Sequence, residues 1–458
     1  MNIPRIALAH EKRPGKVPQS ILAAAALKNL GHPLKIFCAG PDEYLSRLAG
    51  LILGEDVTVL DPLSCGNARI FKTLFQRASR PDSLNIILVP LGERTGGDTF
   101  SFFPEGAEIC RQLECPMVPV IYSDSSAGVA SRIIEEMTDR FSGPGGISLP
   151  AVLFSSVLNP REYQLLEIET GRRSPLMVLG YIPATLERGA PDLLEMCLPD
   201  SSAKISLQVK TAAAQLGASA GQVDWNILWG VARFHDEWTQ NPEPLKGKFT
   251  GLSVGIVDHE ALRLEGDNAR QLFLMFGCSV KMLDLQSRGE AGLNALYIPH
   301  GPGFLLAEHL LGNPGIKEWF HSFFRSRRGI FVNGGVTPLL GRSFSLPNDR
   351  QYEGMGIFPF RGKFELPSLG IRRVEISSRE GDSVLNIGEK MRGHMPSCCS
   401  VLNPDDEAPS LWTLKEPGKI RNFGFSGWSR GKGIATDVCI QPWSNIEGMG
   451  RWLAFCKS

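Results

Sequence analysis

Two short segments carry residues whose types and spacing could do chemistry, and the first is a loop at residues 9–17, AHEKRPGKV, after an apolar run. It ends in Gly15 and Lys16, as phosphate-binding loops do, where backbone N–H groups and a lysine face phosphate oxygens. The fit is incomplete, because an alanine replaces the first glycine, Pro14 removes an N–H donor and Val17 offers no oxygen to Mg²⁺. The loop is therefore either a degenerate phosphate cradle or a solvated basic turn.

The second segment is residues 329–341, GIFVNGGVTPLLG, an apolar strand followed by a turn with two glycines and an apolar helix start. An elbow of this shape displays a nucleophile at its tip, with neighbouring N–H groups as an oxyanion hole. Asn333 stands at the tip, and asparagine tolerates the positive φ that tip residues often adopt. An amide is no nucleophile, so the elbow either persists without its nucleophile or is an ordinary Asn-Gly-Gly turn.

Alternating strands and helices must position the first segment. An apolar strand at 5–9 and a helix at 18–31 precede a strand at 34–37, which is the pattern of a βαβ unit. Pro18 opens this helix and Gly31 ends it. Later apolar runs continue the alternation at 85–89, 118–121, 151–154 and 176–179. The pattern predicts a parallel sheet covered by helices on both faces.

A second α/β pattern follows a change of composition. Helical stretches at 203–216 and 224–234 lead into a Pro/Gly/Lys-rich segment at 240–248, which is typical of a domain boundary. Strands are then expected at 253–258, 280–285 and 295–299, with helices at 268–276 and 314–324. We therefore predict an α/β protein of two domains, each a largely parallel sheet flanked by helices. A P-loop-like domain would span 1–200, a helical segment and linker 201–248, and a second domain 249–458.

The composition excludes several classes of protein. The 458 residues hold 48 basic and 48 acidic side chains, so there is no electrostatic footprint for nucleic acid or an anionic membrane. We see no signal peptide and no apolar run of about 18 residues that would span a bilayer. The ten cysteines form no CxxC pair, so we expect reduced, mostly buried thiols in a cytoplasmic protein, and no metal site.

Further landmarks accompany these two segments. They are FCAGPD at 37–42, LN at 158–159 followed by REY at 161–163, LGYIP at 179–183, the strand region 254–262, ALYIPHG at 295–301 and RGH at 392–394. In this order and spacing they resemble the cobyrinic acid a,c-diamide synthases. The resemblance implies a dethiobiotin-synthetase-like ATP domain followed by a class I glutamine amidotransferase domain. Enzymes of that family amidate acetate side chains of a corrin or related tetrapyrrole.

The departures from the family fall on the glutaminase chemistry. Asn333 takes the place of the nucleophilic cysteine, and residues 437–442, DVCIQP, hold no histidine where the family has Y-x-H-x-H-F. Cys439 and Gln441 stand near those histidine positions, and Cys439 is either a displaced thiol or, as we expect, a buried core residue. His394, on the family's G-H motif, is interpreted as structural or substrate-facing. The other histidines are expected mostly at the solvated surface.

The nucleotide site is degenerate as well. Gly15, Lys16 and Asp42 are its candidate remnants, whereas Val17 replaces the metal-binding threonine and Cys38 the lysine before G-P-D. ATP and Mg²⁺ are the cofactors that the resemblance implies, and we expect both to bind weakly.

Three functions follow from these observations. The first is a catalytically degenerate homologue that binds a tetrapyrrole or an active paralogue, as a heterodimer or a homodimer. The second is an ATP-dependent ligase that uses free ammonia, with an inert glutaminase half. The third is a binding or regulatory role unrelated to tetrapyrroles, which a shared fold permits.

The predicted boundary has a direct test. Limited proteolysis is expected to cut first between about residues 236 and 250, because exposed linkers are cleaved preferentially. A dominant first cut within residues 254–340 would contradict this division of the chain.

Overall fold

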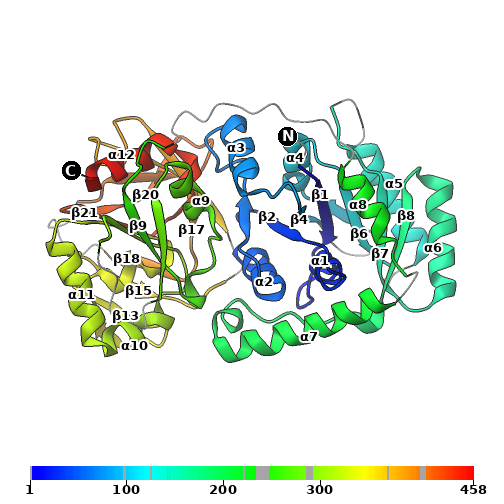
Figure 1. Cartoon of the computed structure of the whole chain (residues 1–458), viewed down its shortest axis with the longest axis horizontal. Coiled ribbons are helices and arrows are strands. Elements are labelled where there is room, and N and C mark those ends of the chain that lie inside the picture. The colour runs from blue at the N-terminus through cyan, green and yellow to red at the C-terminus, as the bar shows by residue number, and fades with distance from the viewer. Residues whose placement is uncertain are drawn as a thin grey trace.

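The first half of the chain folds around one eight-stranded sheet (Figure 1). The computed structural model describes residues 3–95, 99–123, 126–141, 143, 145–219, 222–233, 247–284, 292–368, 371–402 and 409–457. The strand order is β3-β2-β4-β1-β6-β7-β8, all parallel, and β5 pairs antiparallel with β4. The strands are β1 (Arg5–Glu11), β2 (Leu34–Ala39), β3 (Thr58–Leu60), β4 (Leu84–Arg94), β5 (Phe100–Phe102), β6 (Met117–Tyr122), β7 (Ala151–Val157) and β8 (Met177–Pro183).

Helices cover both faces of this sheet, as the continuous apolar strands predict. Ile6 and Leu8 of β1 pack into one cluster, and the alternate residues Ala7 and Ala9 pack into another on the opposite face. The first cluster includes side chains of α1 (Gln19–Asn29), α2 (Glu43–Leu53), α7 (Pro199–Ala218) and α8 (Trp225–Arg233). The second includes side chains of α3 (Ala68–Ala78), α4 (Pro104–Leu113), α5 (Ala127–Phe141) and α6 (Pro160–Arg173).

The described residues of the second half form three sheets. The largest has the order β10-β9-β11-β12-β22-β21 and is parallel except for the β21–β22 pair. Its strands are β9 (Ser253–Val257), β10 (Ser279–Leu283), β11 (Ala295–Ile298), β12 (Gly329–Asn333), β21 (Trp428–Arg430) and β22 (Gly433–Thr436). The helices of this half are α9 (Asn268–Met275), α10 (Phe304–Gly312), α11 (Pro314–Arg325) and α12 (Ile446–Lys457).

The two smaller sheets were not expected from the sequence. A four-stranded sheet has the order β14-β13-β15-β18, and a five-stranded antiparallel sheet has the order β20-β19-β16-β17-β23. Their strands are β13 (Ser343–Ser345), β14 (Gln351–Glu353), β15 (Arg361–Phe364), β16 (Arg372–Ser378), β17 (Lys390–Met395), β18 (Cys399–Leu402), β19 (Trp412–Lys415), β20 (Asn422–Ser426) and β23 (Cys439–Ile440). These strands are short and half-exposed, so they lack the apolar runs that reveal the parallel strands.

The α/β class is confirmed, and most predicted elements are present with shifted ends. The helical stretch after residue 200 begins at Pro199, and it packs against α1 and α2 of the first half. The end of the second predicted helix at residue 234, the Leu285 end of the predicted strand and residues 240–246 of the predicted linker lie outside the described residues. The division into domains therefore remains a prediction.

The two halves share buried polar contacts. Asp267, just before α9, accepts hydrogen bonds from Thr58 Oγ1 at 2.6 Å and from Gln271 Nε2 at 2.8 Å. It also pairs with Lys35 Nζ of β2 at 3.5 Å, and these two side chains are only 7 % and 4 % exposed. Asn268 bonds the backbone N–H and C=O of Val59 through its side-chain amide, both at 2.8 Å. The edge of the first sheet is thus joined to the second half by satisfied buried groups.

Removing this buried carboxylate should destabilise the protein. We expect Asp267→Ala to lower the free energy of unfolding by about 3 kcal/mol, because Lys35 stays buried without its counter-charge. Urea denaturation measures the change, and Asp258→Ala is the matched control. Asp258 pairs with Arg263 at the surface, where such pairs contribute less than about 1 kcal/mol. Equal losses in the two variants would contradict the interpretation.

Candidate functional site

The predicted phosphate loop begins inside β1, which extends to Glu11, and several of its polar groups are bonded within the chain. Gly15 has a φ of 70° and accepts a hydrogen bond from Ala190 N at 2.9 Å through its carbonyl. Val17 N donates to the carbonyl of Arg188 at 3.0 Å, and Lys16 N donates to that of Arg13 at 3.3 Å. The N–H groups of residues 16 and 17 therefore do not face a ligand.

The lysine of the loop has an internal partner as well. Lys16 Nζ lies 3.1 Å from Glu187 Oε2, and Ser156 Oγ donates to the other oxygen of the same carboxylate. Ser156 has a φ of 61°, a conformation that non-glycine residues adopt rarely and mostly where the surroundings fix it. The carboxylate of Glu187 thus occupies a lysine–hydroxyl pair that could otherwise hold an anion.

A cavity of about 380 Å³ opens beside this loop. It is lined by His10, Lys12, Arg13, Pro14, Gly15, Lys16, Pro18, Asp42, Glu43, Tyr44, Leu45, Pro90, Ala190, Pro191, Asp192 and Leu193 of the first half, and by Pro367, Ser368, Ile371 and Ser397 of the second. Burial, assisted by Lys12, lowers the pKa of His10 to about 3, so this histidine is neutral. The lining combines a neutral imidazole, three cationic and three acidic side chains, and apolar walls, which is the mixture of polar groups and apolar surface typical of ligand pockets.

Asp42 lies between this cavity and a second, smaller one. Its carboxylate caps α2 by accepting a hydrogen bond from Leu45 N at 2.8 Å, so its structural role is clear. Burial raises the pKa of Asp42. The smaller cavity is about 40 Å³, and Asp42 and Glu43 line both spaces. Gly15 and Lys16 therefore line only the larger cavity, His394 and Cys439 line only the smaller one, and Asp42 lines both.

The elbow at residues 329–341 differs from the expected geometry. Asn333 is the last residue of β12, with an extended φ of −108°, and the positive φ of 66° belongs to Gly334. The segment after it is a 3₁₀ helix, Gly334–Leu340. Asn333 therefore lacks the positive φ that tip residues often adopt, and its side chain is fully buried.

Hydrogen bonds hold the Asn333 amide in place. Nδ2 faces Glu265 Oε2 at 2.8 Å, Tyr297 Oη at 2.9 Å and Ile440 O at 3.1 Å. Oδ1 accepts a hydrogen bond from Ile440 N at 2.8 Å. The amide therefore joins β12 to β23, which is a structural role.

His300 fills the space beside the elbow. Its Nδ1 accepts a hydrogen bond from Gly335 N at 2.8 Å, and its Nε2 lies 2.9 Å from Glu43 Oε1. A Cβ on Gly334 would lie 2.6 Å from Nδ1, so only glycine fits there. The N–H of Gly335, which an oxyanion hole would need, is thus already donated to an imidazole.

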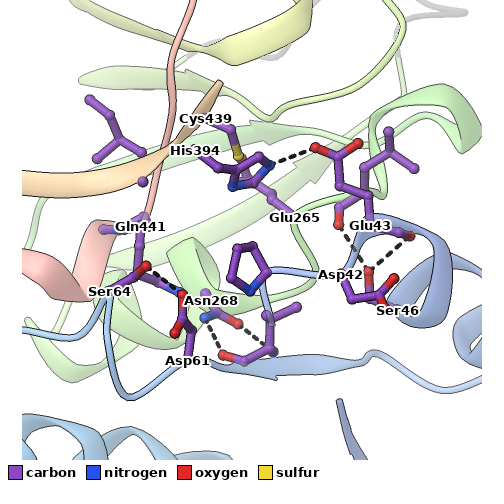
Figure 2. A pocket seen from close by; sticks show the side chains of 16 residues that line it. Asp42, Glu43, Ser46, Asp61, Ser64, Glu265, Asn268, His394, Cys439 and Gln441 are labelled. Carbon is purple, nitrogen blue, oxygen red and sulfur yellow. Dashed lines mark hydrogen bonds and ion pairs between the residues drawn. The ribbon is translucent and has the colours of Figure 1, made fainter. Parts of the chain in front are cut away.

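Glu43 connects this elbow to His394. His394 Nε2 lies 2.6 Å from the same Oε1 atom that His300 contacts (Figure 2). Burial would raise the pKa of Glu43, but the two imidazoles outweigh it and hold that pKa well below its ordinary value. The carboxylate of the first half is therefore charged and inserted between two histidines of the second half.

Cys439 and Gln441 complete the set of predicted residues. Cys439 pairs with His394 across β17 and β23, and burial raises the pKa of its thiol well above the ordinary value. Gln441 caps a short 3₁₀ turn through Trp443 N at 3.4 Å and lines the smaller cavity. Cys439 is thus a buried, protonated thiol, as expected.

The structure brings Asn333, Cys439, His394 and Asp42 into one region, whereas Gly15 and Lys16 lie across the larger cavity. Sequence reasoning missed Glu43 and His300. The expectation that histidines other than His394 are mostly solvated was wrong for His10 and His300, which are 3 % and 0 % exposed. The sequence held one usable indication of Glu43 and His300. Each follows a predicted parallel strand, and ligand sites gather at the carboxyl ends of such strands.

All ten cysteines are buried and unpaired in disulfides, as the sequence predicts. Across the described ranges, none of the helices combines the length and apolarity needed to cross a membrane.

The fold is of the α/β class, and both the loop after β1 and the elbow after β12 have polar groups bonded within the chain, near the start of α2. No protein-family model matches the chain. Three curated relatives named cobyrinate a,c-diamide synthase match it. That of Thermoplasma volcanium is 29% identical over 461 residues, covering 100% of this chain and 98% of its own. That of Thermoplasma acidophilum is 22% identical over 403 residues, covering 86% and 87%. That of Magnetococcus marinus is 26% identical over 186 residues, covering 40% and 39%.

The resemblance to the cobyrinic acid a,c-diamide synthases is thereby confirmed along the chain. Solved structures give only distant likenesses. PurLQS from Thermotoga maritima has a TM-score of 0.34 and 11% identity, covering 44% of this chain and 98% of its own. A glutamine amidotransferase has a TM-score of 0.32 and 13% identity, covering 45% and 99%.

The closed loop predicts weak nucleotide binding. Calorimetry with Mg-ATP should give a dissociation constant no tighter than about 0.1 mM, or about −5.5 kcal/mol. Glu187→Gln, which removes the carboxylate that pairs with Lys16, should bind inorganic triphosphate measurably better than the unaltered protein. Micromolar Mg-ATP binding that Lys16→Ala abolishes would overturn the prediction and favour the ammonia-using ligase.

Proposed function

We propose that this chain is a catalytically degenerate cobyrinate a,c-diamide synthase-like protein that binds a tetrapyrrole between its halves and does not hydrolyse glutamine. The observation that carries the proposal is the burial of Asn333 and the engagement of its amide by Glu265, Tyr297 and Ile440. A glutaminase of the family needs a thiolate and a histidine as a unit, and losing both leaves little rate.

The contacts of His300 support the same conclusion. Catalysis at an elbow depends on N–H groups that are aimed at the developing oxyanion. Here the N–H of Gly335 donates to His300, and Glu43 fixes that ring from the other side. A substrate carbonyl would have to displace a buried imidazole whose two nitrogens are both hydrogen-bonded.

The larger cavity supports binding. Its volume of about 380 Å³ falls within the range of about 300–1,000 Å³ that is typical of ligand pockets. Tyr44, Leu193 and Ile371 provide apolar walls, and the exposed Lys12 lies at the rim with Asp42. A flat macrocycle would place its ring on these apolar walls and its peripheral carboxylates on Lys12, Arg13 and Lys16, although Asp42, Glu43 and Asp192 line the same cavity. The relatives' names, cobyrinate a,c-diamide synthase, point to the same class of ligand.

The binding proposal is tested by titrating the protein with cobyrinic acid and following the absorbance of the macrocycle. We expect saturable binding that Lys12→Glu weakens at least several-fold, because a carboxylate at the rim repels those of the ligand. Lys204→Glu makes the same charge change on the exposed surface of α7 and should leave binding unchanged. Equal effects of the two variants, or no spectral change with the unaltered protein, would contradict the proposal.

The catalytic part is tested by glutamate release from glutamine, with an active amidotransferase as positive control. We expect no turnover from the unaltered protein or from Asn333→Cys, because an unactivated thiol with a pKa of about 8.5 is largely protonated at pH 7. The substitution should also cost about 1–3 kcal/mol of stability, since buried acceptors lose their donor. The double variant, Asn333→Cys with Cys439→His, supplies both a thiol and an imidazole, and it is the variant in which we would look for a trace of activity. If the unaltered protein released glutamate and Cys439→Ser abolished this activity, Cys439 would be the nucleophile in place of a cysteine at position 333.

A further inference from the structure

The larger cavity contains an imidazole whose proton position is fixed from within the chain. His10 Nδ1 lies 2.8 Å from Ser20 Oγ, and both side chains are buried. Within the described part of the chain, the Ser20 hydroxyl has this one hydrogen-bond partner. A buried hydroxyl proton needs an acceptor, so Ser20 donates to Nδ1, and the neutral ring carries its own proton on Nε2.

The Nε2–H group of His10 is a donor without charge. Burial beside Lys12 keeps the ring neutral, because it lowers the pKa of His10 to about 3. His10 lines the cavity of about 380 Å³, and its Nε2 atom has no hydrogen-bond partner among the described residues. A neutral N–H can donate to the oxygen of an amide or of an acid, but it cannot neutralise the charge of a carboxylate.

A carboxylate reaches the same cavity from two strands away. Only β4 separates β1 from β2, and Pro90 of β4 pairs with His10. The register of β2 on β4 brings the end of β2 to nearly the same level, and Asp42 follows that end and caps α2. The helices α1, which carries Ser20, and α2 cover the same face of the sheet (Figure 1).

The separation of the two strands suits one carboxamide group. Neighbouring strands lie about 4.8 Å apart, so the backbones of β1 and β2 are about 10 Å apart. Two hydrogen bonds of about 2.9 Å on either side of an amide span roughly 8 Å. Asp42 Oδ1 already accepts from Leu45 N, but a carboxylate has about four acceptor positions, so capping leaves it free to accept another N–H.

We propose that the ligand of the larger cavity places a carboxamide between His10 and Asp42, so that the protein binds an amidated macrocycle in preference to the corresponding acid. The amide oxygen accepts from His10 Nε2, and the amide NH2 group donates to Asp42. This inference rests on the proposed function, because it concerns a side chain of the tetrapyrrole in that cavity. The reaction that supplies such a ligand is the amidation of a peripheral carboxylate, which this chain would not itself perform.

A carboxylate at the same position would be disfavoured for two reasons. It offers no N–H to Asp42, and it brings a like charge beside that residue. Lys12 is a charged neighbour of both His10 and Asp42, but its side chain is exposed, so water and salt screen its charge. Lys12, Arg13 and Lys16 remain available to carboxylates elsewhere on the macrocycle.

Parallel titrations with cobyrinic acid and its a,c-diamide, followed by the absorbance of the macrocycle, test the inference. We expect the unaltered protein to bind the diamide at least tenfold more tightly than the acid. Asp42→Asn should remove this preference by strengthening acid binding, because the new amide donates to a carboxylate and carries no charge. Asparagine is also a good N-cap, so α2 should persist.

Asp192→Asn is the matched control. Asp192 lines the same cavity and accepts a hydrogen bond from Glu195 N at 2.7 Å, but it is exposed, so the preference for the diamide should survive. His10→Gln retains an N–H donor and should keep most of the affinity for the diamide, whereas His10→Leu should lose at least tenfold. Each variant is compared only after its tryptophan fluorescence and elution volume match those of the unaltered protein.

Two failures are distinguishable. If the acid binds as tightly as the diamide, or if folded Asp42→Asn keeps the preference, this inference is overturned while the proposed binding of a tetrapyrrole stands. If neither macrocycle binds, both proposals are overturned together.

Discussion

A single buried carboxylate organises the junction of the two halves. Glu43 begins α2 in the first half, and its Oε1 atom lies between imidazoles of the second. A buried charge is tolerated only when it is paired and hydrogen-bonded, so the position of Glu43 fixes those of His300 and His394. Because His300 also accepts the N–H of Gly335, the start of α2 is linked through one imidazole to the elbow after β12.

In both regions where the sequence resembles a catalytic site, polar groups are bonded to other parts of the chain. The groups concerned are the lysine of the loop and the backbone N–H of the elbow, which the family resemblance would direct at a substrate. Lys16 pairs with Glu187, as it would with a phosphate, and Gly335 donates to His300, as it would to an oxyanion. The larger cavity is lined both by residues of the loop after β1 and by residues at the start of α2.

Much of the fold could be predicted from the sequence, because the parallel strands are continuous apolar runs. The run at 85–89 lies within β4, and Ile6 and Leu8 alternate with Ala7 and Ala9 as a strand covered on both faces requires. The small antiparallel sheets escaped prediction since their strands are short and half-exposed. Glu43 and His300 escaped because their meaning depends on a contact between residues 257 positions apart, which no local pattern encodes.

The placement of Asn333 explains why the closed elbow would be difficult to reopen. Its amide donates to Glu265 and Ile440 and accepts from the Ile440 N–H, and a thiol can replace few of these bonds. Each buried group left without a partner costs about 1–3 kcal/mol, so a cysteine restored at this position begins at a disadvantage. The imidazole of His300 would also have to move away from Gly335. Glu43 would then lose one of the two imidazoles that pair with its buried charge. Reopening the elbow therefore requires changes on both halves of the chain, since the group that holds His300 in place belongs to α2.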